Sequence, residues 1–282
     1  MKFGIHLSTM VHAWSDDHFA PMERLKAMGY DGVEFPLMDP ENFDLMRAKS
    51  ELKRLNLLAT CGTGLLPHAD ITSKDPVVHK AGVDRLLRCL QIAHELESDL
   101  LGGVLYAPWG VTRPRMEIIE GKKRSQETLR QLAEKAKAYG VKMGLEMINR
   151  YETSYLNHTE DAAEWMAAIN DPMIGIHYDT FHANIEETNQ KEAILSLGQH
   201  LFHVHFCENN RGIPGTGQVD FSSVAEGLKE IGYDRWLTLE NFALADCQIG
   251  NDCAIWNSKT QDPYQAAEQG LQYAKKIWEE TK

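Results

Sequence analysis

Short apolar runs alternate along this chain with longer amphipathic segments. Each run is bounded by glycine, proline or polar residues, and the segment after it repeats apolar positions at i, i+3, i+4 and i+7. The segments 19–29, 77–96, 126–140 and 266–280 show this helical period clearly. The runs predict eight strands, over residues 3–8, 32–35, 57–61, 100–105, 141–146, 174–179, 201–206 and 236–240.

Eight strand–helix units in 282 residues average about 35 residues each, which is close to the repeat of a (β/α)8 barrel. A doubly wound open sheet is the competing α/β fold, but its phosphate-binding fingerprint is missing. The glycines at 62–66 (GTGLL) lack the third glycine and the helix that should follow it. No linker-like stretch divides the chain, so we expect one (β/α)8 TIM barrel domain over 1–282 that ends in a helix.

Composition narrows the class of protein. The chain has 29 basic and 41 acidic residues, a net charge of −12, which disfavours an extended nucleic-acid footprint. The five cysteines are scattered and form no CxxC, so disulfides and a thiolate zinc site are not expected. The first residues lack the long apolar core of a signal peptide, and no run approaches 18 uncharged apolar residues. These features predict a cytoplasmic protein without a membrane partner.

Four residues capable of binding a metal stand at the ends of the last four predicted strands. In a barrel, the carboxyl ends of the strands line one mouth, where the chemistry gathers. The spacings between the four are 33, 26 and 35 residues, about one repeat each, so successive strands should each deliver one side chain to the same rim. A single carboxylate at such a place is usually a helix cap, but four in register indicate a metal site. The four residues are Glu146, Asp179, His205 and Glu240.

Three carboxylates and one imidazole form a hard donor set, which favours Mn²⁺, Mg²⁺ or Co²⁺ in an octahedral shell over structural zinc. Four protein ligands leave two positions for water or substrate oxygens, as expected of a catalytic site.

Four segments make the sequence similar to a known family. The segments 144–153 (GLEMINRYET), 178–188 (YDTFHANIEET), 202–217 (FHVHFCENNRGIPGTG) and 228–242 (LKEIGYDRWLTLENF) resemble the ketose 3-epimerases, the D-tagatose/D-psicose 3-epimerase family of xylose isomerase-like barrels. The resemblance implies a (β/α)8 barrel that binds one divalent cation, usually Mn²⁺ or Co²⁺, and epimerises free ketoses at C3. It implies homodimers or homotetramers.

The same resemblance assigns roles to individual residues. It places the metal ligands on the four strand-end residues, and it makes Glu146 and Glu240 the catalytic acid and base. It further implies that Glu152, His182 and Arg211 hold the substrate. Inversion of C3 through a cis-enediolate needs a base on one face and an acid on the other, and strands 5 and 8 can supply them from different sides of the rim.

Other residues are expected around the sugar. Trp14, Trp109 and Phe242 lie on predicted loops at the mouth and should wall its apolar face. His6 stands after strand 1 where the family usually has an aromatic residue, so contacts to the distal hydroxyls should differ. His177 and His203 share strand faces with two of the ligands and are expected deeper in the barrel.

Several functions remain open on this site. An aldose–ketose isomerase or a 3-keto-sugar 4-epimerase would fit the same ligands. A sugar-phosphate epimerase would need an anion site in the loops after strands 7 and 8. Those loops (207–219 and 241–262) carry more acidic than basic residues, Glu208 among them, and this argues for an unphosphorylated sugar. A non-catalytic sugar-binding protein would keep the ligands but needs no opposed carboxylates.

Overall fold

Eight parallel strands close into a barrel in the computed structural model, which describes residues 1–242, 244–260 and 262–281. Each strand pairs with its neighbour in sequence, and β8 pairs with β1. The strands are β1 (Lys2–His6), β2 (Gly32–Pro36), β3 (Leu58–Leu65), β4 (Leu100–Pro108), β5 (Lys142–Met147), β6 (Ile174–Asp179), β7 (Leu201–Phe206) and β8 (Trp236–Leu239). The chain is therefore a (β/α)8 TIM barrel, as its sequence predicts.

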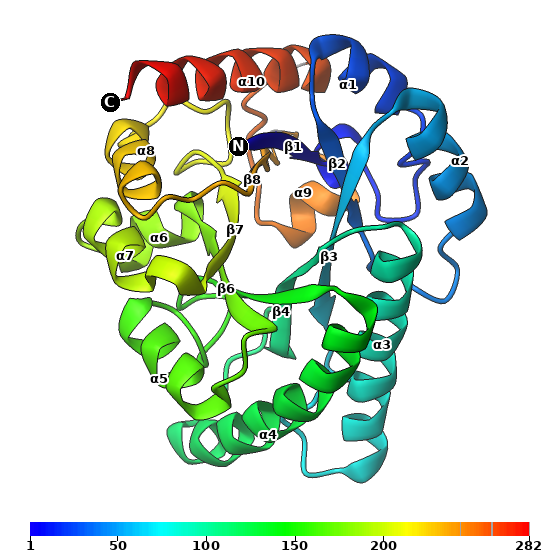
Figure 1. Cartoon of the computed structure of the whole chain (residues 1–282), viewed down its shortest axis with the longest axis vertical. Coiled ribbons are helices and arrows are strands. Elements are labelled where there is room, and N and C mark those ends of the chain that lie inside the picture. The colour runs from blue at the N-terminus through cyan, green and yellow to red at the C-terminus, as the bar shows by residue number, and fades with distance from the viewer. Residues whose placement is uncertain (243, 261, 282) are drawn as a thin grey trace.

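Helices surround the strands (Figure 1), and α10 lies beside α1, so that the last helix completes the ring at the first. They are α1 (Met22–Met28), α2 (Leu45–Leu55), α3 (Pro76–Glu95), α4 (Arg115–Tyr139), α5 (Thr159–Ile169), α6 (Thr180–Glu186), α7 (Gln190–Leu197), α8 (Phe221–Glu230), α9 (Gln248–Asp252) and α10 (Pro263–Glu280), with 3-10 turns at Leu7–Met10 and Gly198–His200. Aspartates at positions 44, 75, 220 and 262 cap α2, α3, α8 and α10 by accepting backbone N–H groups, which fixes where these helices begin.

The strand bounds differ from the predicted ones mainly at strands 1, 3 and 4, and strand 4 continues to Pro108 instead of ending at Leu105. Strand 1 ends at His6, because residues 7–10 turn into a 3-10 helix whose apolar side chains are buried like those of a strand. Strand 3 continues to Leu65, since the glycines that suggested a loop pair with β4. In strand 8, Leu239 is the last strand residue and Glu240 follows directly.

Side chains alternate along the strands between two environments. The outward set, such as Phe35, Leu145 and Phe206, packs beneath the helices in the main hydrophobic core. The inward set is largely polar or glycine: His6 pairs in register with Glu34, and Gly62 with Gly102. The inner face of the barrel is therefore largely polar, while the outer face is apolar.

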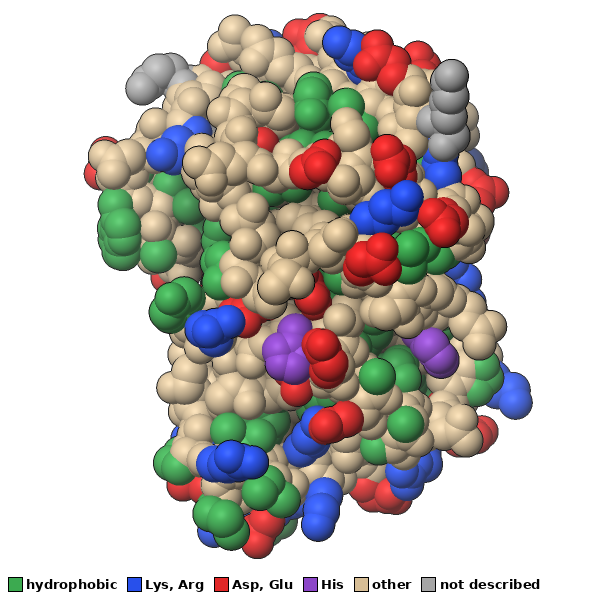
Figure 2. All heavy atoms as spheres, turned by 90° about the vertical axis from the view of Figure 1, so that its left-hand side faces the viewer, with side chains coloured by type: hydrophobic (Ala, Val, Ile, Leu, Met, Phe, Trp, Pro, Cys, Tyr) green, Lys and Arg blue, Asp and Glu red, His purple; other side chains and the backbone are tan. Residues whose placement is uncertain are grey.

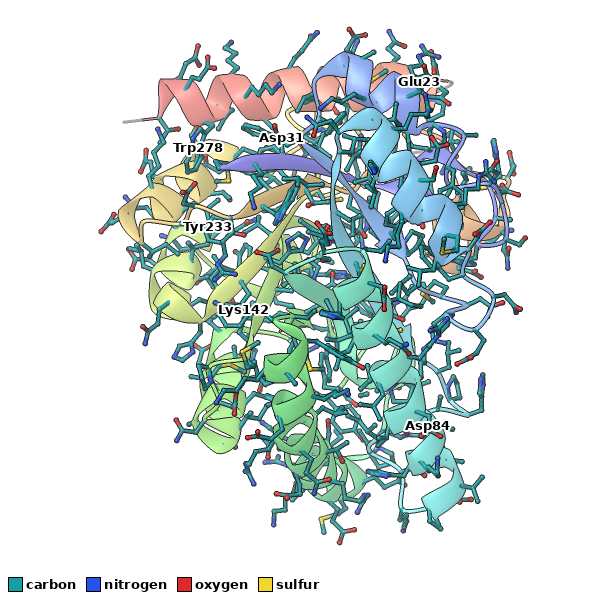
Figure 3. All side chains as sticks on the ribbon, turned by 45° about the vertical axis from the view of Figure 1, so that its right-hand side comes forward. Glu23, Asp31, Asp84, Lys142, Tyr233 and Trp278 are labelled. Carbon is teal, nitrogen blue, oxygen red and sulfur yellow. The ribbon has the colours of Figure 1, made fainter. Side chains whose placement is uncertain are left out.

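Residues near the amino-terminal ends of the strands, among them Asp31, Lys142 and Tyr233 (Figure 3), interact outside the barrel interior. Asp31 accepts the backbone N–H of Phe3 at 2.8 Å, and the Tyr233 hydroxyl donates to the Trp236 carbonyl at 2.7 Å. The Lys142 ammonium lies 4.5 Å from the centre of the Phe202 ring. Such contacts stabilise the barrel and leave the opposite end free for binding.

The outer surface carries intermixed acidic and basic side chains on the face shown in Figure 2. Ion pairs connect neighbouring helices there, as between Lys191 on α7 and Glu226 on α8, 3.1 Å apart. Among the described residues, no helix is long and apolar enough to cross a membrane.

Candidate metal centre and active-site pocket

The four strand-end residues meet at the carboxyl-terminal mouth of the barrel. Glu146, Asp179, His205 and Glu240 each offer one donor atom, and these atoms all lie within 4.8 Å of one another. All four side chains are buried. Oxygen-to-metal bonds of about 2.0–2.6 Å allow donors on one ion to be up to roughly 5 Å apart, so the spacing fits a single divalent cation. Nδ1 of His205 is buried without a hydrogen-bond partner in the described structure, as a nitrogen awaiting a metal would be.

Asp179 has a second task at the end of β6. One carboxylate oxygen accepts the backbone N–H of Phe181 at 2.8 Å and caps α6. The other oxygen accepts from Arg211 at 2.9 Å. Asp179 therefore both caps α6, as a strand-end aspartate commonly caps a helix, and belongs to the four-residue cluster.

Arg211 lies inside the cluster. One guanidinium nitrogen donates to Asp179 at 2.9 Å and to Glu240 at 2.6 Å, and the group lies 3.8 Å from the centre of the Phe181 ring. The residue has a φ of 59°, in the left-handed region, so the loop after β7 bends sharply to present it. Burial disfavours the charge, but the neighbouring thiol and carboxylates raise the pKa of Arg211 well above its ordinary value.

The two glutamates have opposite electrostatic surroundings. Burial, reinforced by the charges of Glu240 and Asp179, raises the pKa of Glu146 well above its ordinary value. Burial also opposes ionisation of Glu240, but His205 and Arg211 outweigh it and lower the pKa of that carboxyl. Two carboxyl groups in one pocket with their pKa values pushed apart are suited to exchanging a proton with a substrate.

Glu152 stands next to the cluster on the loop after β5, and His182 stands next to it in the first turn of α6. Glu152 accepts the indole N–H of Trp109 at 2.8 Å and an amide N–H of Asn149 at 2.8 Å. Burial raises the pKa of Glu152, but His182, Arg211 and these hydrogen bonds leave it below the ordinary value. The backbone N–H of Asn149 also donates to Nδ1 of His182 at 3.1 Å.

The predicted aromatic wall forms at the mouth. The rings of Trp14 and Trp109 meet edge-on with centres 6.3 Å apart, and the Trp14 indole N–H donates to Asp252 at 2.7 Å. Phe242 lies edge-on to His6 at 6.0 Å. Ten of the eleven predicted site residues line one pocket, and Asp179 lies behind them, 1% exposed.

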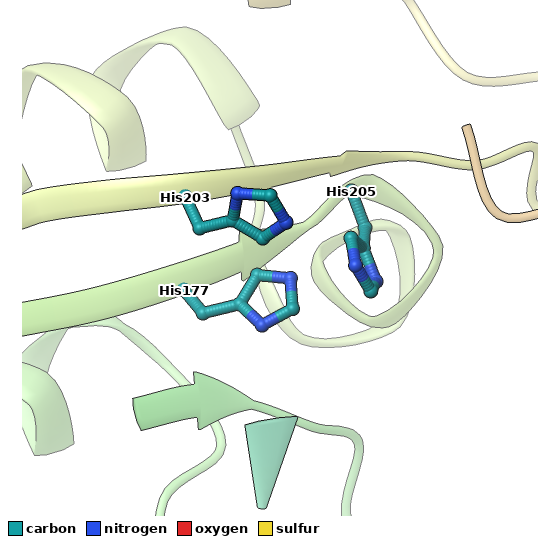
Figure 4. A group of neighbouring side chains, drawn as sticks. All are labelled: His177, His203 and His205. Atoms are coloured by element: carbon teal, nitrogen blue, oxygen red, sulfur yellow. The ribbon is translucent and has the colours of Figure 1, made fainter. Parts of the chain in front are cut away.

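Two further histidines lie deeper in the barrel, as expected (Figure 4). His177 and His203 are fully buried on β6 and β7, beneath His205. Nε2 of His203 is 2.7 Å from a carboxylate oxygen of Glu34, whose other oxygen is 3.0 Å from Nε2 of His205. Neither ring nitrogen of His177 has a hydrogen-bond partner within the described ranges, and its Nδ1 lies 3.8 Å from Glu146.

Glu208, which the sequence argument counted against phosphate, is not among the described residues that line the pocket. Its buried carboxylate accepts four backbone N–H groups of its own loop at 2.9–3.0 Å, those of Asn209, Gly215, Gln218 and Val219. This residue organises the loop that carries Arg211. Arg211 is the only Lys or Arg among the described residues that line the pocket, and its charge is already paired with two carboxylates. This pairing leaves the described part of the pocket without a free positive charge for a phosphate group.

Sequence reasoning missed three residues of this region. Cys253 lines the pocket from the loop after α9, where no pattern marked it. Asn149 was visible as the first residue of the NRYE motif, and Glu34 as a glutamate inside an apolar strand. Asn149 follows the rule that polar residues beyond the carboxyl ends of barrel strands face the mouth, whereas Glu34 lies in the middle of β2 and is buried in the barrel interior.

Comparisons with known proteins agree with this geometry. The family model described as xylose isomerase-like TIM barrel matches residues 22–277. A ketose 3-epimerase of Arthrobacter globiformis is 37% identical over 86% of this chain and 84% of its own. An L-ribulose 3-epimerase of Methylomonas sp. is 33% identical over 98% and 99%.

A solved structure, a D-allulose 3-epimerase from Methylomonas sp. in complex with D-allulose, superposes with a TM-score of 0.90 at 31% identity, covering 98% of this chain and 97% of that one. The chain belongs to the xylose isomerase-like TIM barrels and, within them, to the ketose 3-epimerases, which are carbohydrate isomerases.

Proposed function

We propose that this protein inverts C3 of a free ketose, of the D-tagatose, D-psicose, D-fructose or L-ribulose type, through a cis-enediolate. The observation that carries the proposal is geometric: Glu146 and Glu240 line one pocket from different strands and, with Asp179 and His205, bring four donor atoms within 4.8 Å of one another. The ketose 3-epimerases to which the chain is similar support the same reaction.

Glu146, Asp179, His205 and Glu240 would hold one divalent cation. Mn²⁺ is the ion we favour, with Co²⁺ or Mg²⁺ next, because three of the four donors are hard carboxylate oxygens. When bound, such an ion would supply Lewis acidity to the sugar and so make the C3 proton easier to remove.

The two glutamates move the proton. One carboxylate removes the C3 proton from one face of the sugar, and the other carboxyl delivers a proton to the opposite face. Glu146 comes from β5 and Glu240 from the end of β8, so they approach from different strands of the rim. Which of them acts as the base depends on the configuration of the substrate, and they exchange roles in the reverse reaction.

The neighbouring residues would hold the oxygens on which charge accumulates. His182 lines the pocket with Nδ1 accepting the backbone N–H of Asn149 and with Nε2 3.2 Å from a guanidinium nitrogen of Arg211, and it would hydrogen-bond the C1 or C2 oxygen of the sugar. Arg211 is a donor at the same site. Glu152, held by the Trp109 indole, can accept from substrate hydroxyls, and Trp14, Phe242 and His6 would contact the rest of the sugar.

Incubation of Mn²⁺-loaded protein in D₂O with matched free and phosphorylated ketoses tests the proposal. We expect deuterium at C3 of a free ketose, together with the C3 epimer. Deuterium at C1 with aldose formation would identify an isomerase, and inversion at C4 of a 3-keto sugar would identify a 4-epimerase. A phosphorylated ketose turning over with a tenfold higher kcat/KM would refute the free-sugar assignment, and no exchange of any carbon-bound proton would indicate a binding protein.

Two broader expectations belong to the same proposal. We infer a cytoplasmic location, supported by five cysteines that are all free, three of them buried. A homodimer or homotetramer is expected from the family resemblance, and sedimentation of the purified protein tests it.

A further inference from the structure

Glu34 is a buried carboxylate in the barrel interior. It lies on β2, is 0% exposed, and accepts the hydroxyl of Thr60 at 2.7 Å. Its two oxygens lie 2.7 Å from Nε2 of His203 and 3.0 Å from Nε2 of His205, so one group bridges two histidines of the same strand. Burying a carboxylate costs free energy unless it is paired in this way, so the two histidines and Thr60 are needed to keep Glu34 inside the barrel.

The surrounding strands are shaped to receive it. Thr60 pairs with Glu34 in the register of β2 and β3. A Cβ at Gly62, two residues further along β3, would lie only 2.9 Å from the nearer Glu34 oxygen, so this position leaves room for the carboxylate. His203 is 0% exposed and holds the other Glu34 oxygen. The carboxylate is therefore fixed from three sides.

We propose that Glu34 is a positioning residue that keeps a proton on Nε2 of His205 and so directs the Nδ1 lone pair at the three carboxylates of the metal centre. An ionised carboxylate can only accept hydrogen bonds, so the imidazole nitrogen that faces it must carry a hydrogen. The inference rests on the proposed metal site, for which His205 is the nitrogen ligand.

The other nitrogen of His205 shows why this matters. Nδ1 lies 3.3 Å from a Glu240 oxygen and 3.9 Å from a Glu146 oxygen. Without Glu34, a proton on Nδ1 would be stabilised by hydrogen bonding to Glu240, and a protonated nitrogen cannot bind a metal. With Glu34 in place, the hydrogen of the neutral ring is held on Nε2, and Nδ1 keeps the lone pair that a cation needs. Removing a carboxylate that hydrogen-bonds to a metal-binding histidine usually weakens metal affinity by about 10–100-fold.

A double-mutant cycle on Mn²⁺ affinity, measured by titration calorimetry, tests the proposal. Glu34→Leu removes the acceptor, and we expect its dissociation constant to rise at least tenfold. In a His205→Gln background the same substitution should change affinity less than twofold, because its effect passes through His205. Additive effects in the cycle, or an unchanged affinity in Glu34→Leu, would overturn the proposal.

Electron spin echo spectra of the Mn²⁺-loaded proteins give a second readout. The ¹⁴N coupling of a coordinated imidazole should be present in the wild type and weakened or lost in Glu34→Leu; an identical coupling would count against the inference. Asp70→Asn is the matched control, because Asp70 is also a buried carboxylate, 2% exposed, which accepts from Thr72 away from the pocket. It should lower stability but leave Mn²⁺ affinity unchanged.

If Glu34→Leu does not fold, Glu34→Gln and Thr60→Val take its place. A glutamine oxygen can accept from only one of the two histidines, and Thr60→Val removes a hydrogen bond to the carboxylate, so both should weaken Mn²⁺ binding severalfold. Wild-type affinity in both would refute the role of Glu34. Failure of the wild type to bind Mn²⁺ would instead refute the metal site itself, so the two failures are distinguishable.

Discussion

Arg211 supplies positive charge to the carboxylates of the site, and replacing it by methionine should make the protein depend on a metal ion for stability. Methionine keeps a long side chain against Phe181 but removes both charge-assisted hydrogen bonds, to Asp179 at 2.9 Å and to Glu240 at 2.6 Å. Both carboxylates remain buried, 1% and 6% exposed. Removing one partner of a buried ion pair costs about 3–5 kcal/mol, because the remaining charge is left uncompensated.

For a chain of this length, that loss corresponds to a Tm lower by about 5–8 °C. We expect this deficit in EDTA, where no cation replaces the guanidinium. Saturating Mn²⁺ should recover most of it, since a divalent ion compensates the same carboxylates, and Mn²⁺ should therefore stabilise Arg211→Met more than the wild type. Urea unfolding of both proteins, with EDTA and with Mn²⁺, measures the difference.

The pH dependence has a definite sign. The folded-state pKa of Glu240 is depressed, so its contribution is present above the ordinary value of 4.5 and is lost as the pH falls through the lower folded-state value. Without Arg211 this carboxyl protonates more easily, so the deficit of the variant should be largest near neutral pH and shrink below about pH 4.5. Arg47→Met is the control, because Arg47 pairs with Asp17 at an exposed site, where each side chain is 47% exposed, and should alter the midpoint little. A deficit that Mn²⁺ leaves unchanged, or one below about 1 kcal/mol in EDTA, would refute the reasoning.

Three further predictions follow from the site and its loops. Glu146→Gln and Glu240→Gln should each abolish net epimerisation. In D₂O, one variant should still exchange the C3 proton of one C3 epimer, and the other variant should exchange that of the other epimer. If the same variant exchanges neither epimer, the assignment of the two glutamates to opposite faces is wrong. Glu208→Gln should lower stability by about 1–3 kcal/mol and reduce kcat/KM, because an amide cannot accept all four loop N–H groups that hold Arg211 in place; unchanged urea midpoints would argue against this role. Burial lowers the pKa of His18 from 6.5 to about 4, so as the pH falls the unfolded chain binds a proton before the folded chain does, and stability should fall between about pH 6.5 and pH 4. The thermal midpoint of His18→Gln should fall less steeply over this range. An equal slope in the variant and the wild type would disprove the contribution of His18.

The sequence alone determined the barrel and the residues at its mouth. Strand and helix periods are local properties, and a (β/α)8 repeat brings every strand end to the same rim, so Glu146, Asp179, His205 and Glu240 could be grouped from spacing alone. The family motifs added Glu152, His182 and Arg211. The grouping by spacing needed only the order of the strands, and the three added residues needed only the resemblance.

The tertiary structure decided which of these side chains touch each other and in what state of charge. Glu34 and His203 are 169 residues apart and meet only because the closed barrel turns β2 and β7 toward one interior. Glu208 reads in the sequence as an acidic loop residue, but the path of its loop turns the carboxylate onto backbone N–H groups. Whether Arg211 is free for an anion depends likewise on its distances to two carboxylates. Such pairings depend on how the barrel closes and on how its loops fold back, and neither is encoded in a local pattern of residues.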